Sequence, residues 1–220
     1  LDLSSDSITA DEEKGLVFMR EEEKLAQDVY SVLYGQWDLT VFDRISSSES
    51  THTQAIKVLL DAFGIEDPAL PEAGKFSDPS LQTLYDTLVS QGSVSEAEAL
   101  KVGIKIEELD IKDIEDELAS ATNVYIIRVY GNLQRASRNH LRAFYRNLES
   151  MGESYEPQYL TNEEFDAIIT SDFERGNMAG NGNRYGRESN GKRGNGKGNG
   201  RNGGSGMQGD QNRDGSCVNN

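Results

Sequence analysis

Two histidines and several carboxylates interrupt apolar stripes in this sequence, and their types and spacing could do chemistry. Glu49 and His52 form a Glu-x-x-His pattern, which places both side chains on one face of a helix, one turn apart. Carboxylate-bridged metal sites in helix bundles use that spacing. Residues 49–52 are therefore candidates for part of a metal site.

Three other segments place ionisable residues on apolar stripes in the same way. Burying such a charge unpaired is costly, and a shared divalent cation would remove most of the cost. Oxygen and imidazole ligands together suit iron, manganese or zinc. The predicted metal ligands are Glu23, Glu49, His52, Glu107, Asp110 and His140.

Other readings of these residue types carry weight. A single histidine on such a stripe more often pairs with a backbone group or a carboxylate, so only the joint placement of His52 and His140 with the acids favours a metal. Tyr30 and Tyr130 are expected to fill the core. A solvated helix face, with no role in the site, is the expectation for Glu21, Glu22, Glu115, Asp116 and Glu117.

Helical periodicity and end signals predict four long helices that position these residues. The first runs from a Thr9-x-x-Glu12 capping box to Gly35, and the second spans about 40–63 before Gly64. A third begins at Ser95, and a fourth spans about 124–151. Each helix carries at least one predicted ligand near its middle.

The connection between the second and third long helices is long enough to cross the length of a bundle. It contains a short helix that Asp78 can cap and Pro79 can begin, ending near Gly92. A last short helix follows Thr161 and ends near Asp172. The predicted fold is therefore all-α, an up-down four-helix bundle with a long crossover that contains a short helix.

Composition divides the chain into two parts. Residues 174–220 are rich in Gly, Asn and Arg with almost no large aliphatic residues, so they are expected to form a disordered tail after a bundle domain of residues 1–173. The tail carries 8 Lys or Arg against 4 Asp or Glu, a net +4, whereas the bundle carries 14 against 34, a net −20. Nucleic acid is a disfavoured partner for such an acidic domain, and any anionic surface or polymer would meet the tail.

The remaining compositional signals concern location. No apolar run is long enough to span a membrane. The chain opens at Leu1 and its one cysteine, Cys217, lies near the end of the tail, so we expect a processed, exported protein that is periplasmic, cell-surface or extracellular, with the cytoplasm as the alternative.

The four-segment pattern resembles the ferritin-like superfamily, particularly the rubrerythrin-type di-iron bundles. Segments 19–30 (MREEEKLAQDVY), 106–111 (IEELDI) and 137–144 (SRNHLRAF) more closely resemble an uncharacterised bacterial and archaeal family of unknown function, numbered 2202. The resemblance implies that Glu49 is a bridging carboxylate with His52 as its partner. It implies that the other ligands are Glu23 on the first long helix, Glu107 and Asp110 on the third and His140 on the fourth, with Glu22 and Glu108 as neighbours that a shift of register would bring into the site.

The sequence departs from the rubrerythrin pattern at one position. A second Glu-x-x-His is expected on the fourth long helix, where Ser137 stands in place of the glutamate before His140. A dinuclear centre relies on bridging carboxylates, so the sequence leaves open whether each chain binds one ion or two.

Two functions follow as expectations. The resemblance implies an oxidoreductase in which iron or manganese acts on dioxygen, peroxide or the metal itself, with a homodimer as a compatible assembly. No Cys-x-x-Cys pair is present, so electrons would come from a partner or from the substrate metal. The alternative is a non-catalytic protein with a structural cation and a basic tail that anchors it to a surface.

Overall fold

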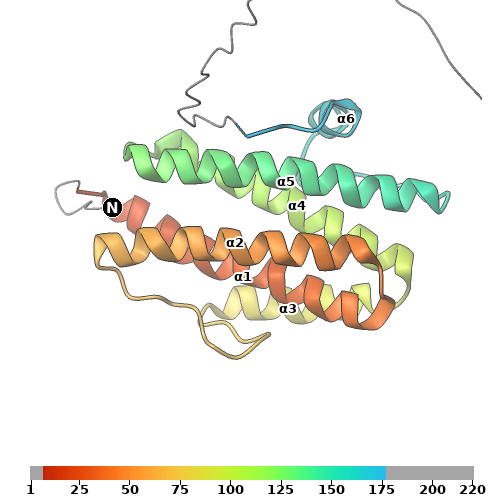
Figure 1. Ribbon diagram of the computed structural model, residues 1–220, viewed down its shortest axis with the longest axis horizontal. Coiled ribbons are helices and arrows are strands. Elements are labelled where there is room, and N and C mark those ends of the chain that lie inside the picture. Colours follow the sequence, from red (N-terminus) through yellow and green to blue (C-terminus); the bar gives the residue numbers. More distant parts are fainter. Residues whose placement is uncertain (1–6, 177–220) are drawn as a thin grey trace, which may run out of the picture. The chain divides into compact units, whose positions relative to one another are not determined.

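The computed structural model describes residues 7–176 of the chain, and over these residues the regular secondary structure is α-helix alone. Four long helices lie side by side in Figure 1: α1 (Ala10–Trp37), α2 (Thr40–Phe63), α4 (Glu96–Ser120) and α5 (Val124–Ser150). The prediction of an all-α fold is confirmed for this part of the chain. Most of the predicted tail, and Cys217 with it, lies outside the described residues.

Local capping explains where most helices begin. The Thr9 hydroxyl accepts from the Glu12 backbone N–H while the Glu12 carboxylate accepts from the Thr9 N–H, so α1 starts with a full capping box. Ser95 and Asn123 cap α4 and α5 with their side chains. Gly64 ends α2 with φ of 71°, a conformation that glycine adopts without strain.

The end of α1 differs from the sequence prediction. The helix continues through Gly35 to Trp37 and ends at Asp38, whose φ is 53°. The Trp37 indole N–H donates to the Gly92 carbonyl, 2.9 Å away, and the Gln36 amide donates to the Ser93 carbonyl. These contacts with the end of α3 hold two further residues of α1 in helical conformation.

Short links and close contacts set the helix directions. Two residues separate α1 from α2, and three separate α4 from α5, so each pair is an antiparallel hairpin. Gly15 of α1 lies against Glu117 of α4, whereas the Tyr30 hydroxyl lies near Gly103 and Glu107 of α4. Helix α4 is therefore antiparallel to α1, and it runs in the same direction as α2.

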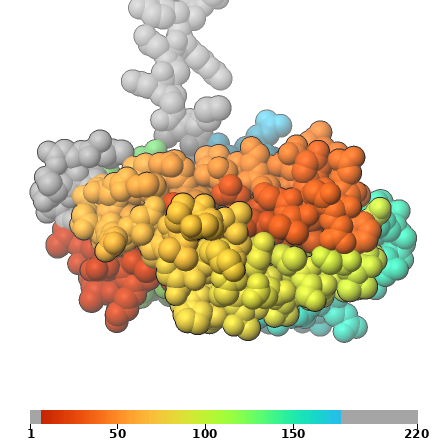
Figure 2. All heavy atoms as spheres, turned by 90° about the horizontal axis from the view of Figure 1, so that it is seen from below, coloured from red at the N-terminus to blue at the C-terminus, as the bar shows by residue number. Residues whose placement is uncertain are grey.

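The crossover that connects α2 to α4 contains α3 (Pro79–Gly92), which contacts both α1 and α4. In Figure 2 this yellow segment lies beside the lime-coloured α4, and the orange side formed by α1 and α2 borders both. After α5, α6 (Asn162–Thr170) packs on the outer side of that helix. No helix among the described residues is long and apolar enough to cross a membrane.

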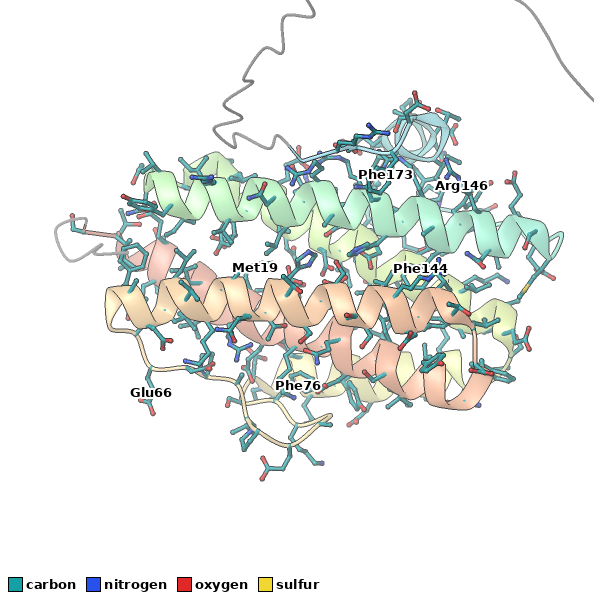
Figure 3. The ribbon with its side chains drawn as sticks, in the orientation of Figure 1. Met19, Glu66, Phe76, Phe144, Arg146 and Phe173 are labelled. Carbon is teal, nitrogen blue, oxygen red and sulfur yellow. The ribbon has the colours of Figure 1, made fainter. Side chains whose placement is uncertain are left out.

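Two apolar clusters fill the bundle on either side of its middle. One is centred on three mutually tilted rings, Tyr30, Phe42 and Phe144, whose centroids lie 5.1 to 5.9 Å apart. The other contains Met19 and Tyr130. Figure 3 shows Met19 and Phe144 pointing inward from α1 and α5. The polar side chains of the predicted site belong to neither cluster.

Candidate metal centre

The predicted ligands come from all four long helices, and most of them are deeply buried. Exposed fractions are 1% for Glu23, 1% for Glu49, 0% for Glu107 and 1% for Asp110. The two imidazoles retain slightly more contact with solvent, with 10% of the His52 side chain and 12% of the His140 side chain exposed. Acids this deep in a protein require partners or a bound cation.

Glu49 lies at the centre of the site because each of its carboxylate oxygens faces a different histidine. Its Oε2 atom lies 2.6 Å from Nδ1 of His52, and its Oε1 atom lies 2.8 Å from Nδ1 of His140. The two imidazole rings are nearly parallel, with an interplanar angle of 24° and centroids 5.7 Å apart. The Glu-x-x-His pattern of α2 and the histidine of α5 thus meet at one carboxylate.

Two further carboxylates complete two groups of three ligands. Glu23 Oε2 lies 3.2 Å from Nδ1 of His52, and Glu107 Oε2 lies 3.5 Å from Nδ1 of His140. In each group the three ligand atoms lie within 4.8 Å of one another. Glu49 belongs to both groups, so the arrangement is two three-ligand sites that share one carboxylate.

The orientation of several of these atoms fits a cation better than hydrogen bonds within the protein. The contact between His140 Nδ1 and Glu49 Oε1 lacks hydrogen-bond geometry, and both atoms are buried without a hydrogen-bond partner among the described residues. Oε2 of Glu107, which faces the same nitrogen, and Oε1 of Glu23 are also buried without a partner there, whereas Nδ1 of His52 forms hydrogen bonds with Oε2 of Glu23 and Oε2 of Glu49. Buried polar atoms are nearly always paired, so these convergent atoms fit a metal ion.

Electrostatics of the metal-free site show how strongly the groups interact. Burial raises the pKa of Glu23 to about 8, although contact with His52 works against that shift. Burial opposes ionisation of Glu49 as well, but His140 and His52 together hold its pKa well below the usual range. Burial lowers the histidine pKa values, yet the adjacent carboxylates outweigh it, raising the pKa to about 11 for His52 and about 10 for His140. Without a metal, the protonated imidazoles supply the positive charge that balances the acids. A bound cation would supply that charge instead, and the histidines would lose their protons.

Groups around the ligands fix their positions. The Tyr30 hydroxyl donates to Oε1 of Glu107 at 2.7 Å, so this ring packs in the core and also holds a ligand. The Ser48 hydroxyl lies 3.1 Å from Nε2 of His140, the nitrogen remote from the ligands. Such outer contacts orient metal-binding histidines. Neither Tyr30 nor Ser48 could be assigned to the site from periodicity alone.

Asp110 and Ser137 stand apart from the two groups. Asp110 contributes to neither group, and both of its oxygens are buried without a hydrogen-bond partner among the described residues. The Ser137 hydroxyl donates to the Leu133 carbonyl of its own helix at 3.2 Å, so the residue that replaces the expected glutamate does not face the ligands as a donor.

Several acids that the sequence assigned to a solvated face prove to be buried. Glu21 and Glu22 are each 3% exposed, and Glu117 is half-buried, whereas Glu115 and Asp116 are exposed as predicted. Helix α1 contacts α2, α3 and α4, so it buries more of its circumference than a single stripe. Glu21 accepts from the backbone N–H groups of Ser77 and Asp78 before α3.

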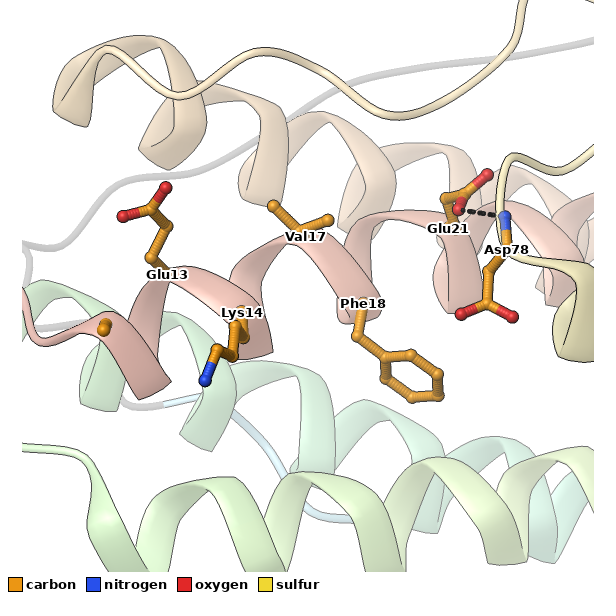
Figure 4. A pocket seen from close by; sticks show the side chains of 7 residues that line it. Glu13, Lys14, Val17, Phe18, Glu21 and Asp78 are labelled. Atoms are coloured by element: carbon orange, nitrogen blue, oxygen red, sulfur yellow. Dashed lines mark hydrogen bonds between the residues drawn. The ribbon is translucent and has the colours of Figure 1, made fainter.

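A surface hollow of about 410 Å³ lies beside Glu21 and Asp78, away from the ligands. Val17 and Phe18 of α1 form its apolar wall, and Glu13, Lys14, Glu21 and Asp78 lie around it (Figure 4). None of the six predicted ligands lines it. The metal-ligand geometry is therefore inside the bundle, separate from this hollow.

Comparison with known proteins gives a consistent assignment. Residues 12–172 match the model of a family described as an uncharacterized protein domain, DUF2202. The chain is 48% identical over 175 residues to the uncharacterized protein MJ0754 of Methanocaldococcus jannaschii. This alignment covers 79% of this chain and 95% of the relative. The crystal structure of the hypothetical protein MJ0754 from Methanococcus jannaschii matches with a TM-score of 0.76 at 47% identity, over 77% of this chain and 98% of the solved one.

Proposed function

This chain belongs to the DUF2202 domain family, and from that premise we propose that its bundle holds a ferritin-like carboxylate and histidine centre for two divalent metal ions. The observation that carries the proposal is the position of Glu49, whose two oxygens face His52 and His140 within two ligand groups. A carboxylate shared in this way is the element that holds two cations about 3.5–4 Å apart in dinuclear sites.

The arrangement of the helices supports the ferritin-like assignment. Ferritin-like folds combine two helical hairpins with one long crossover, and their ligands project inward from all four helices. Here α1 and α2 form one hairpin, α4 and α5 form the other, and residues 64–95 connect them through α3. The Glu-x-x-His pattern occurs once, on α2, so Glu49 is the one shared carboxylate among the described groups.

The ligand count favours a reactive centre over a closed structural site. Each group offers three protein ligands, whereas a closed structural site supplies four or more from the protein. Because Ser137 bonds to its own helix, it adds no further ligand. Coordination positions would remain for water, dioxygen or peroxide.

Iron or manganese bound here would supply electron-transfer chemistry toward dioxygen or peroxide. The role of the chain is to hold the ligands in place: Tyr30 fixes Glu107, and Ser48 fixes His140. The tilted rings of Tyr30, Phe42 and Phe144 are fully buried, and the Tyr30 hydroxyl connects them to the site at Glu107.

Elemental analysis of the natively purified protein tests the proposal, beside a Glu49→Ala/His52→Ala variant. The matched control is Glu115→Ala/Asp116→Ala, which removes two exposed acids from α4. Nearly two iron or manganese ions per chain, lost in the first variant and kept in the control, is the expected result. A ratio of about one ion per chain would indicate a mononuclear centre instead of a dinuclear one.

No specifically bound metal in the native protein would refute the metal centre. Tightly bound zinc or calcium, with no absorbance change when peroxide is added, would favour the structural-cation alternative. Circular dichroism of each variant establishes that loss of metal is not loss of fold. The basic tail as a surface anchor stays a prediction about residues that the structure does not describe.

A further inference from the structure

A second set of acids lies along the interface between α1 and α4, outside the two ligand groups. Asp110, Asp113 and Glu117 follow one another along α4 toward its C-terminal end, and Glu22 faces them from α1. Glu22 lies near Asp113, Glu117 and Glu23. The acids thus connect the metal ligands to the end of the bundle where α1 begins.

Their burial decreases steadily along this line. Glu107 is 0% exposed, Asp110 1% and Glu22 3%, whereas Asp113 and Glu117 are half-buried and Asp11 at the end of the line is exposed. A row of acids that passes from solvent into a low-dielectric interior concentrates cations along its length.

The buried members of this row lack partners within the protein. Both oxygens of Asp110 and one oxygen of Glu22 are buried without a hydrogen-bond partner among residues 7–176. The Tyr130 hydroxyl of α5, which lies near Glu117 and Glu22, is also buried without a partner there. Over the same residues no Lys, Arg or His forms an ion pair with Glu22, Asp110, Asp113 or Glu117, and the adjacent Lys112 pairs with Glu115 and Asp116.

Gly15 leaves space on α1 for the outer acids of this row. It is buried in α1, and a Cβ atom added to it would collide with the Glu117 carboxylate. Glycine within a helix is less favourable than alanine, so the helix carries this residue at a cost to its own stability. The absence of a side chain lets Glu117 lie directly against α1.

We propose that Glu22, Asp110 and Asp113 form a transit site through which divalent transition-metal ions, entering past Glu117, reach the Glu49 centre. This inference rests on the proposed metal centre. These acids do not form a three-ligand group with atoms within 4.8 Å of one another, as the ligands around Glu49 do. An ion here would keep part of its water shell, which favours passage over permanent binding.

The test uses the full-length protein, freed of metal with a chelator, and Co²⁺ as the probe. Stopped-flow absorbance follows the visible bands of bound Co²⁺, and the final ratio of Co²⁺ to chain is measured separately. The variants are Glu22→Gln and Asp113→Asn. Asp116→Asn, with a side chain that is 68% exposed on the same helix, removes the same charge and is the matched control.

Glu22→Gln and Asp113→Asn should slow loading by about tenfold, the lower end of the rate gain that focused electrostatic attraction gives. The control should load at close to the wild-type rate, and the final ratio should be unchanged in all three. Gly15→Ala changes no charge and should also slow loading, because the methyl group displaces Glu117, while its melting temperature stays the same or rises.

Other outcomes overturn the transit site. Wild-type rates in Glu22→Gln, Asp113→Asn and Gly15→Ala would refute it while leaving the Glu49 centre intact. An equal slowing in Asp116→Asn would show that net charge alone sets the rate. A lower final ratio in Glu22→Gln would make Glu22 a ligand of the centre, and a wild-type protein that binds no Co²⁺ would refute the centre itself.

Discussion

Glu108 and Asp110 lie two residues apart on α4, and both are almost completely buried, yet their surroundings are opposite. Glu108 accepts hydrogen bonds from the backbone N–H groups of Gln158, Tyr159 and Leu160 and from the Tyr155 hydroxyl. Asp110 has no hydrogen-bond partner for either oxygen among the described residues. Burial alone therefore does not distinguish an acid that is bonded within the fold from one whose oxygens are free to meet a cation, whereas the presence or absence of protein donors does.

The same contrast divides the acids of α1. Glu12 accepts from the backbone N–H groups of Thr9, Thr122 and Asn123, so it joins the start of α1 to the link before α5. Glu23, by contrast, has a buried oxygen without a partner and lies against His52. Acids whose oxygens have donors connect elements of the fold, and acids that keep at least one buried oxygen without a partner surround the candidate metal centre and the row beside it.

Removal of Glu108 should give the largest effect on stability. Glu108→Ala leaves three backbone N–H groups and a hydroxyl without their acceptor. Gln158 and Tyr159 are exposed, whereas Leu160 is buried and Tyr155 half-buried, so two donors at about 1–3 kcal/mol each give an expected loss of about 2–6 kcal/mol. Urea unfolding at pH 7 measures it, with the exposed Glu115→Ala as the control. A loss as small as that of the control would show that residues 155–160 find other acceptors.

Glu12→Gln should cost less and should depend on pH. Its backbone donors outweigh burial and lower the pKa of Glu12 to about 2, below its ordinary value of 4.5. The carboxylate therefore stabilises the fold fully above pH 4.5, and this contribution is lost as pH falls through about 2. At pH 7 the variant should be less stable by about 2 kcal/mol, as for hydrogen bonds to a charged group.

The measurement for Glu12 is the difference between wild-type and variant unfolding free energies at several pH values. Taking the difference cancels the titration of the other acids. The two proteins should converge in stability toward pH 2. A difference that does not change with pH would mean that shape, and not charge, gives Glu12 its effect.

Ser48→Ala separates positioning of a ligand from stability. The variant removes the contact with His140 Nε2, and loss of such an outer partner typically weakens metal binding by about tenfold or more. Metal titration of the chelator-treated protein measures this, and Ser47→Ala, at the exposed neighbouring position, is the control. Equal affinities in the two variants would remove Ser48 from the site.

The sequence predicted the elements well where the signals are local. Capping by Thr9, Asp78 and Thr161 lies where predicted, because a cap depends on residues within one turn. The Glu-x-x-His pattern likewise placed Glu49 and His52 on one face of α2, where both are buried. The predicted end of α1 at Gly35 was two residues too early, because the contact of Trp37 with α3 extends the helix beyond that glycine.

The sequence failed where long-range packing decides. Glu21 and Glu22 looked solvated because a periodic pattern identifies one buried face, whereas α1 is contacted from several sides. Nothing near Glu108 in the sequence indicates that its donors come from about fifty residues later. The shared position of Glu49 between two histidines likewise depends on the register of α2 against α5, which neither helix encodes alone.

Asp110→Asn should give the smallest change, and with the opposite sign to Glu108→Ala. Burial and the neighbouring Glu22 raise the pKa of Asp110 well above its ordinary value of 3.8. Its carboxyl group is therefore tolerated best below pH 3.8 and destabilises the metal-free fold increasingly as pH rises from there. The neutral asparagine escapes this penalty, so the metal-free variant should be more stable by about 1 kcal/mol at pH 7, or about 2–4 °C in melting temperature.

Thermal unfolding of chelator-treated protein at pH 5 and pH 7 tests this, and the gain should be larger at pH 7. A loss of stability like that of Glu108→Ala would mean that Asp110 has donors after all, and the contrast between the two acids would disappear.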